Sequence, residues 1–509
     1  PEVLARKARE IAQRLGYTAA PDDTAEGFAV QDDFLAYIQK HDKPRPLWDQ
    51  ILAGRPSPLS FWYRESPQPM IPSEFHDDAL TPAIIRPDDP PETVSGMINL
   101  QLDSEGRLMY FQEIPPQLER ASSSTSAFDW NALFSAAGLD AAKLLPSGPE
   151  WLSLAAFDAR AAWRGTWPGT DRPLRIEAAA WRGKPVFFAL IGPWNEAGRM
   201  PSGQESARDK ATGILLLALA LFILIGAVLL ARYNFMRGRG DRSGASRLAL
   251  AVFCVQLLLW LCRAHFAATM GYFRVFILAV STALFAACAI FILYLAVEPY
   301  VRRHWPQTII SWSRLLAGRV RDPLVGRDVL FGVLLGIAWV LVIQFHDLLA
   351  QAAGAAPSFP SSGFLLGARS SLGVWLYHVQ NSVRTTLIFF FLLFLLRTLL
   401  RNQWLAGALF VALIAAPHVI GSERIWLDGI AELLICTIAA IVVLRFGLVA
   451  LAIGIFSADI FVDAPITANP SAWYFGSSLF VISTILVLAI WGFRTALSGQ
   501  RVWKTDIFR

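Results

Sequence analysis

The sequence predicts an α+β soluble domain followed by an all-α polytopic transmembrane bundle of about nine helices. Of the 509 residues, 54% are hydrophobic and only 17% are charged, whereas soluble domains carry about 25% charged residues. The mean hydropathy is +0.43. The apolar residues are unevenly spread, because long uncharged runs begin only after residue 205. These properties exclude a disordered chain, a small disulfide scaffold and an entirely soluble enzyme.

The polar N-terminal part begins with a helical pattern. Leu4, Ala8, Ile11 and Leu15 recur at the spacing of one helix face, and Gly16 ends the run. We therefore expect this part to open with an amphipathic helix.

Two β-hairpins are predicted further along the same part. Residues 98–102 alternate between apolar and polar side chains, residues 103–106 supply a turn, and residues 108–114 return as a strand. The second hairpin follows the same pattern, with strands at 175–181 and 186–191.

A helix precedes each hairpin, and the second helix is expected near residues 131–145. This order suggests two copies of a helix-plus-strands unit joined by the Ser-rich stretch 121–127, although coincidence explains the likeness equally well. We expect extracytoplasmic subdomains at 1–120 and 121–205, followed by a transmembrane domain at 206–509.

Tryptophans are frequent in the polar part, which holds eight of the 18 in the chain. Core and hairpin packing is the ordinary explanation, and an aromatic ligand pocket is the sharper one. Those singled out are Trp48, Trp62, Trp163, Trp181 and Trp194.

Pairs of adjacent aspartates also recur in this part. A calcium loop would need acids at alternate positions and a later Glu, and that pattern is missing. We therefore expect the pairs to be solvated turns. They are Asp22-Asp23, Asp32-Asp33, Asp77-Asp78 and Asp88-Asp89.

The charge distribution predicts the orientation of the transmembrane domain. Residues 1–205 carry 28 acidic and 20 basic side chains, whereas the remaining residues carry 12 acidic and 25 basic ones. The arginines crowd alternate loops, which should be cytoplasmic. Residues 1–205 are then extracytoplasmic and the C-terminus is cytoplasmic, in the inner membrane of a bacterium. Spans are expected near 211–230, 248–268, 275–297, 329–345, 373–400, 404–420, 425–444, 446–462 and 477–494.

Motifs for catalysis and cofactor binding are missing from the sequence. It contains no Walker loop, no GxSxG elbow, no HExxH zinc motif and none of the kinase motifs. The four cysteines lie in apolar runs without CxxC spacing. We expect no cofactor in this chain, and no nucleic-acid partner because the soluble part is acidic.

Five stretches carry a resemblance to a known family. The most specific is EPYVRRHWPQTIISWSRLLAGRVRDPLVGRDVL at 298–330. The others are PEVLARKAREIAQRLGY at 1–17, FWYRESPQP at 61–69, VSGMINLQLDSEGRL at 94–108 and GFRTALSGQ at 492–500. In these stretches, which run the length of the chain, it resembles the long membrane serine/threonine protein kinases common in acidobacteria.

The resemblance implies that this chain is the C-terminal, non-catalytic region of such a kinase, so a fragment. In that family a cytoplasmic kinase domain and one span come first, and ATP and magnesium belong to that domain. The chain would anchor the kinase and sense a signal. The expected partners are the lipid bilayer, the upstream kinase domain, an unidentified extracytoplasmic ligand and a second copy in a homodimer. The rival hypotheses are a transporter or channel with an accessory outer domain, and a membrane enzyme.

Polar side chains gather near the outer membrane face in this topology. Asp428 and Glu432 are four residues apart and share a helix face, and Arg263, Arg384 or Arg424 could pair with Glu432. Structural ion pairs are the ordinary explanation, whereas a vestibule binding a metal, a proton or a small ligand is the functional one. The candidate cluster comprises His346, His378, His418, Glu423, Asp428 and Glu432.

The loop at 298–328 mixes arginines with tryptophans and leucines. This pattern predicts an amphipathic helix on the inner leaflet. The alternative is a docking surface for the kinase domain, and the two are compatible.

Overall fold

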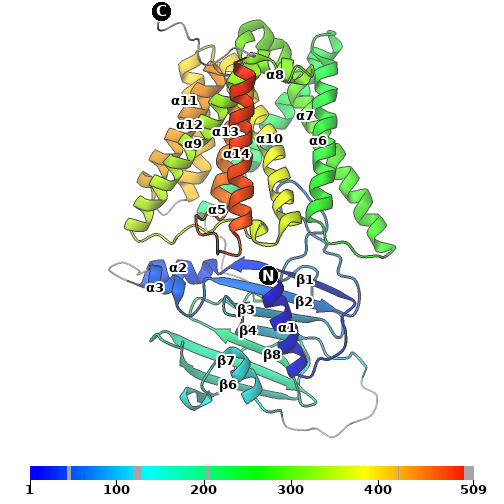
Figure 1. Ribbon diagram of the computed structural model, residues 1–509, viewed down its shortest axis with the longest axis vertical. Coiled ribbons are helices and arrows are strands. Elements are labelled where there is room, and N and C mark those ends of the chain that lie inside the picture. Colours follow the sequence, from blue (N-terminus) through cyan, green and yellow to red (C-terminus); the bar gives the residue numbers. More distant parts are fainter. Residues whose placement is uncertain (43–47, 119–127, 201–206, 422–423, 498–509) are drawn as a thin grey trace, which may run out of the picture. The chain divides into compact units, whose positions relative to one another are not determined.

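The computed structural model describes residues 1–42, 48–118, 128–200, 207–421 and 424–497. The chain forms two compact units (Figure 1). The first, here called the sheet unit, comprises Pro1–Pro201 with two later segments, Arg263–Leu278 and Gln351–Leu366. The second, the helical unit, comprises the rest of the chain. Each unit is described by itself.

The sheet unit contains one eight-stranded antiparallel sheet with the strand order β1-β2-β3-β4-β8-β7-β6-β5. The helices of this unit's N-terminal part are α1 (Glu2–Arg14), α2 (Asp32–His41), α3 (Trp48–Ala53) and α4 (Asn131–Ala137). The strands are β1 (Asp23–Val30), β2 (Leu59–Ser66), β3 (Ile98–Asp103), β4 (Leu108–Glu113), β5 (Leu145–Ser147), β6 (Ala159–Thr166), β7 (Pro173–Trp181) and β8 (Lys184–Ile191).

The two halves of this sheet have the same strand arrangement, although α2 and α3 lie between β1 and β2 only in the first half. Each begins with a helix, α1 or α4, and continues as a four-stranded meander whose last strand lies at the centre. The central strands β4 and β8 pair with each other, with Phe111 opposite Phe188. The boundary expected near residue 120 therefore falls between two halves of one continuous sheet.

Both expected hairpins are present, as β3–β4 and β7–β8. The helix expected at 131–145 is wrong in its second half, because α4 ends at Ala137. Gly138 caps it in the left-handed conformation at φ +61°, which favours glycine. The chain then enters a short 3₁₀ turn and β5.

One face of the sheet forms the hydrophobic core of the unit. Leu100, Phe111 and Phe188 lie side by side across β3, β4 and β8, and all three are fully buried. Helix α1 packs on β2 and β3, and α4 packs on β4. Burial of these large apolar side chains away from water makes the main contribution to the stability of the sheet unit.

The opposite face, here called the cavity face, is covered in its first half by residues 67–97 between β2 and β3. Met70, Ile85 and Met97 of this segment pack against Trp62. The indole of Trp62 lies over Gly27, where a Cβ would come within 2.5 Å of the ring. Glycine at that position lets the ring lie flat on β1.

The helical unit supplies seven helices long and apolar enough to cross a membrane, so the chain has the character of a multi-pass membrane protein. The expected count of about nine is not confirmed, because α11 and α13 are not among these seven in the described chain. The helices are α5 (Ala207–Met236), α6 (Arg242–Arg263), α7 (Gly271–His304), α8 (Pro306–Leu316), α9 (Pro323–Ala352), α10 (Ala368–Leu400), α11 (Gln403–Gly421), α12 (Ile425–Arg445), α13 (Leu448–Asp463) and α14 (Phe475–Ala496).

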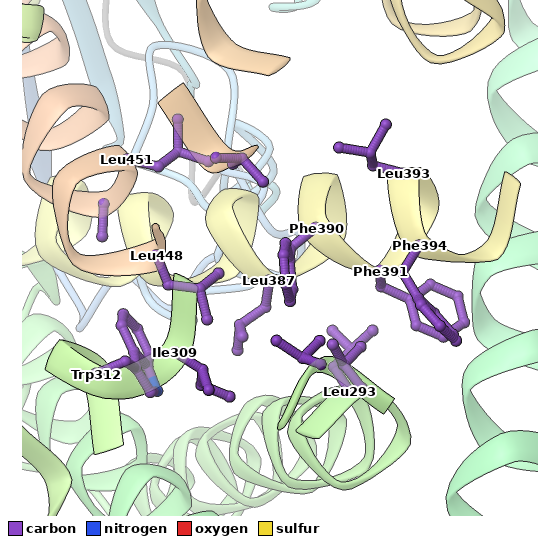
Figure 2. Close-up of a cluster of buried hydrophobic side chains, with 14 of the residues drawn as sticks. Leu293, Ile309, Trp312, Leu387, Phe390, Phe391, Leu393, Phe394, Leu448 and Leu451 are labelled. Atoms are coloured by element: carbon purple, nitrogen blue, oxygen red, sulfur yellow. The ribbon is translucent and has the colours of Figure 1, made fainter. Parts of the chain in front are cut away.

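The core of the helical unit lies where α8, α10 and α13 meet (Figure 2). Phe390 of α10 is fully buried, and Ile309 and Trp312 of α8 are buried in the same cluster. The amphipathic helix expected within 298–328 is therefore α8, and its apolar face packs on other helices. A Cβ at Gly447, which has φ +93°, would come within 2.4 Å of the Thr308 carbonyl oxygen, so glycine permits this approach.

A buried carboxyl in the sheet unit makes its stability depend on pH. Tyr17 Oη donates to Pro185 O at 2.8 Å and contacts Glu113 Oε2 at 3.2 Å. Burial raises the pKa of Glu113 to about 7, against opposing effects of the Tyr17 hydroxyl and Lys184. An acid with a raised folded-state pKa destabilises the fold progressively as pH rises through the window between its unfolded value near 4.5 and about 7.

We therefore expect Glu113→Gln to be more stable than the wild type at pH 7.5, by on the order of 3 kcal/mol, and to lose this advantage at pH 4.5. Thermal melts of the full chain in detergent across this pH range measure the difference. Glu10→Gln, which changes an exposed acid of α1, should follow the wild type at every pH. A constant difference between Glu113→Gln and the wild type would contradict the prediction.

Candidate functional site

A cavity of about 960 Å³ opens on the cavity face of the sheet unit. This volume is within the range of pockets that enclose small molecules. Its floor is formed by side chains that lie opposite one another on β3, β4 and β8. The floor residues are Asn99, Gln101, Tyr110, Gln112, Phe187 and Ala189.

A carboxylate is held in position at one side of this floor. The side-chain amides of Asn99 and Gln112 each donate a hydrogen bond to one carboxylate oxygen of Glu92. Tyr110 Oη donates to Gln112 Oε1 at 2.9 Å, which fixes the orientation of that amide. Asn99 Nδ2 also donates to Pro87 O at 2.9 Å. Three floor side chains therefore support one acidic group.

The electrostatics of the cavity follow from burial. Burial raises the pKa of Glu92, while the hydrogen bond from Asn99 and the charge of Arg64 act in the opposite direction. Burial also raises the pKa of Tyr110. The Asn99 side-chain oxygen is buried without a hydrogen-bond partner among the described residues.

Aromatic side chains form much of the remaining wall. Trp167 and Trp194 stack with ring centroids 6.0 Å apart, and Trp151 lies on the wall formed by residues 150–154. Of the five tryptophans singled out from the sequence, Trp194 lines this cavity. Trp163 instead packs on Phe134 of α4, with centroids 4.8 Å apart. Trp151 and Trp167 lie in irregular segments and had no periodic pattern to single them out.

The wall at residues 87–92 is fastened to the sheet by Arg64. This arginine is 1% exposed, and its guanidinium donates to Arg86 O at 2.9 Å and to Pro90 O at 2.5 Å. Asp89 accepts hydrogen bonds from Ser73 N at 3.1 Å and from His76 Nε2 at 2.7 Å. The cavity wall and residues 73–76 are thus joined by one buried carboxylate.

The same segment is bonded to the connection between α6 and α7. Asp77 Oδ2 lies 2.6 Å from Nη1 of Arg263, the last residue of α6. His265 N donates to Ala83 O at 2.8 Å, and its Nε2 lies 2.7 Å from Asp23 Oδ1 at the start of β1. In three of the four acid pairs, the expectation of a solvated turn is therefore wrong for one of the two aspartates. Asp23, Asp77 and Asp89 are bonded inside the unit.

The α9–α10 connection belongs to the sheet unit as well. Ala356 N donates to Gln39 Oε1 of α2 at 2.9 Å. Phe364 of the same connection is 1% exposed. Two inter-helix connections therefore form part of the unit that contains the cavity.

In the helical unit, His346 lies beside Asp428. His346 Nε2 lies 2.6 Å from Asp428 Oδ1, which joins α9 to α12, and its Nδ1 lies 3.1 Å from Asp347 Oδ1. Glu432 lies one turn further along α12 and accepts from the Cys436 thiol at 3.9 Å.

His378 belongs to a separate cluster. Its Nε2 lies 3.1 Å from Asp463 Oδ2 and its Nδ1 lies 3.9 Å from Asp459 Oδ2, although neither ring nitrogen is aligned for a hydrogen bond. Asn381 Nδ2 donates to Asp459 Oδ2 at 3.0 Å, and Arg384 donates to Asn381 Oδ1 at 2.9 Å. The described residues contain no group of three or more His, Cys, Asp or Glu placed to hold a metal.

The remaining predicted site residues lie elsewhere. Glu423 and the side chain of His418 are outside the described part of the chain. Of the arginines proposed to pair with Glu432, Arg263 pairs with Asp77 and Arg384 bonds to Asn381. The six residues are therefore not one site in the part that the structure describes.

Comparison of the chain with protein-family models, with curated proteins and with solved structures finds no match. The features that bear on function are the cavity, its bonds to the α6–α7 connection and the polar clusters of the helical unit.

The His378 cluster should be structural for the bundle. We expect His378→Asn to lower the free energy of unfolding by about 1–2 kcal/mol, because the buried imidazole is the basic neighbour of Asp459 and Asp463, whose partly exposed side chains weaken the pairing. Thermal melts in detergent measure this effect. The control is His41→Asn, since His41 is exposed at the end of α2; its change should stay within about 0.5 kcal/mol. Equal melting of the two variants would overturn the structural role.

Proposed function

We propose that this chain is a sensory and membrane-anchoring region that binds a small molecule in the cavity and passes the event to its membrane helices. One observation carries the proposal. The segment 67–97 forms a wall of the cavity at residues 87–92, and it also bonds to the connection that joins α6 to α7. A change at the cavity wall therefore has a short, bonded route to the end of a membrane-length helix.

The route consists of a few strong contacts. Arg64 holds residues 86–90 against the sheet, and Asp89 ties this wall to His76. The next residue along the chain, Asp77, pairs with Arg263. A ligand that favours one position of residues 87–92 would shift this network toward one arrangement, since a ligand selects the state that it binds better. Spatial continuity alone does not establish coupling, so the contact between Asp77 and Arg263 is the place to test.

The effector is proposed from the resemblance to acidobacterial membrane kinases. A cytoplasmic serine/threonine kinase domain preceding this chain would receive the signal, and ATP and magnesium would bind there. The protein would lie in the inner membrane of a bacterium with residues 1–205 outside. This chain contains no kinase motifs, which is compatible with a kinase domain that precedes it.

The second candidate function is a transporter or channel. It is favoured by the ionisable cluster of His378, Asp459 and Asp463 inside the helical unit, because buried ionisable groups in membrane helices often mark ion or proton routes. Proton flux into liposomes containing the full chain would support this alternative, provided that His378→Asn abolishes it.

The proposed topology predicts the activity of reporter fusions. With the proposed preceding kinase domain and span retained ahead of this chain, alkaline phosphatase fused after Gly198 should be active in a bacterial host, whereas fusions after Gly318 and Arg509 should be inactive. The α6–α7 and α9–α10 connections support this orientation, because both are part of the sheet unit and both are expected outside. An inactive Gly198 fusion together with active fusions at the other two positions would show the opposite topology. That result would contradict the sensor proposal.

The proposed coupling predicts that Asp77→Asn separates binding from transmission. An environment-sensitive dye at Met270→Cys, a position 91% exposed in the α6–α7 connection, would report the signal in a background without the native cysteines. A molecule found by thermal-shift screening should change the dye fluorescence in the parent protein. In Asp77→Asn the change should fall at least several-fold, while quenching of the cavity tryptophans should give a nearly unchanged Kd, because Asp77 is not among the lining residues.

The matched control is Glu74→Gln, which alters an exposed acid of the same segment. It should leave both signals as in the parent. A full dye response in Asp77→Asn would contradict transmission through the Asp77–Arg263 pair, and a failure to find any cavity-dependent ligand would contradict the proposed function itself.

A further inference from the structure

We propose that the cavity of the sheet unit recognises an organic cation, an amine with an apolar body, and that Glu92 is the group that receives its charge. This inference rests on the proposed function, because it names the class of ligand for the same cavity. The inference follows from which polar atoms of the cavity already have hydrogen-bond partners and which do not.

The floor is built to present a carboxylate rather than to present amides. The side-chain N–H groups of Asn99 and Gln112 both donate to Glu92, and the Tyr110 hydroxyl donates to Gln112. These side chains come from β3 and β4 in the middle of the sheet, so their positions are fixed by the strand register. A site for a polyhydroxylated ligand would instead keep such amides open toward the cavity. The supporting groups here converge on one oxygen pair, which suits recognition of a single positive charge.

Glu92 has no ion-pair partner among the described residues. Arg64 is near enough to influence it, but the Arg64 guanidinium donates to the carbonyls of Arg86 and Pro90. Two amide hydrogen bonds leave lone pairs on the carboxylate unused. A largely buried carboxylate with incomplete partners is costly, and a cationic ligand would supply the missing charge and hydrogen bonds.

The other walls suit the rest of such a ligand. The rings of Tyr110, Trp151 and Phe187 line the cavity beside the carboxylate, and aromatic faces attract cations as well as apolar groups. The charged lining is also mostly acidic. Besides Glu92 it contains Asp88, Glu150 and Glu196 against the one basic side chain of Arg199, and Glu150 already pairs with Arg175 at 3.0 Å. An anionic ligand would meet an excess of negative charge.

The protonation of Glu92 gives this inference a pH dependence. Burial raises the pKa of this carboxyl, so the fraction able to receive a cation falls as pH is lowered through the raised value. Binding of the amine should therefore weaken on acidification, and bound amine should in turn lower the pKa of Glu92.

The test uses three probes of one shape and different charge: phenethylamine, 2-phenylethanol and phenylacetate. Each is titrated into the full chain in lipid nanodiscs at pH 7.5, with tryptophan fluorescence as the readout and empty nanodiscs as the blank. We expect phenethylamine to bind most tightly. Glu92→Gln should weaken it by about 10- to 100-fold, the effect of losing a charged hydrogen bond, while Glu10→Gln on α1 should bind as the wild type does. Thermal melts establish that both variants are folded.

Phenethylamine binding that weakens at pH 5 in the wild type, but not in Glu92→Gln, would support the inference further. Equal or tighter binding of the alcohol or the acid would overturn the cation assignment while leaving the cavity as a ligand site. Phenethylamine binding that survives Glu92→Gln, or binding of none of the probes to the folded chain, would also overturn it. The proposed function is tested separately, because the library screen and the dye response do not depend on the charge of the ligand.

Discussion

The architecture of the sheet unit depends on one buried guanidinium. Arg64 points from the second strand into the cavity face, where it is almost completely enclosed and donates to two backbone carbonyls. Burial lowers its pKa, while the nearby acids Glu92, Asp89 and Asp88 act in the opposite direction. A buried cation of this kind requires its acceptors to remain in place. It therefore holds residues 86–90 on the sheet, and this one restraint positions both the cavity wall and the contacts that lead to Arg263.

The two halves of the sheet show how the site arises from a simple topology. In the second half, the connection between β6 and β7 spans only residues 167–172, and its Trp167 lines the cavity. In the first half, the equivalent connection between β2 and β3 spans residues 67–97. The longer connection supplies Glu92, Asp89 and Asp77. The sheet thus acts as a rigid floor, and the functional groups lie on loops, as is common in ligand-binding folds.

The sequence predicted the parts of the fold that have a regular pattern. The hairpins β3–β4 and β7–β8 could be predicted because a turn separates two apolar strands. Strand β2 could not, because each residue from Ser60 to Ser66 is buried and its apolar and polar side chains do not alternate. The tryptophans suggested an aromatic ligand pocket, and Trp194 does line the cavity, but Glu92 could not be singled out because it lies in a proline-rich irregular segment without a motif. The acid pairs misled for a physical reason: Asp88 is exposed and Asp89 is buried, and adjacent residues in a loop can face opposite ways.

The position of Arg263 makes its ion pair with Asp77 the contact on which the proposed transmission depends. Arg263 is the last residue of α6, so the ion pair lies at the point where the chain leaves that helix. Its partner Asp77 is 8% exposed in the side chain, which protects the pair from the salt screening that weakens surface pairs. Asp77 is further restrained by Thr81 N, which donates to Oδ1 at 2.8 Å. Residues 73–77 and Arg263 are therefore held together inside the sheet unit by a pair that is shielded from solvent.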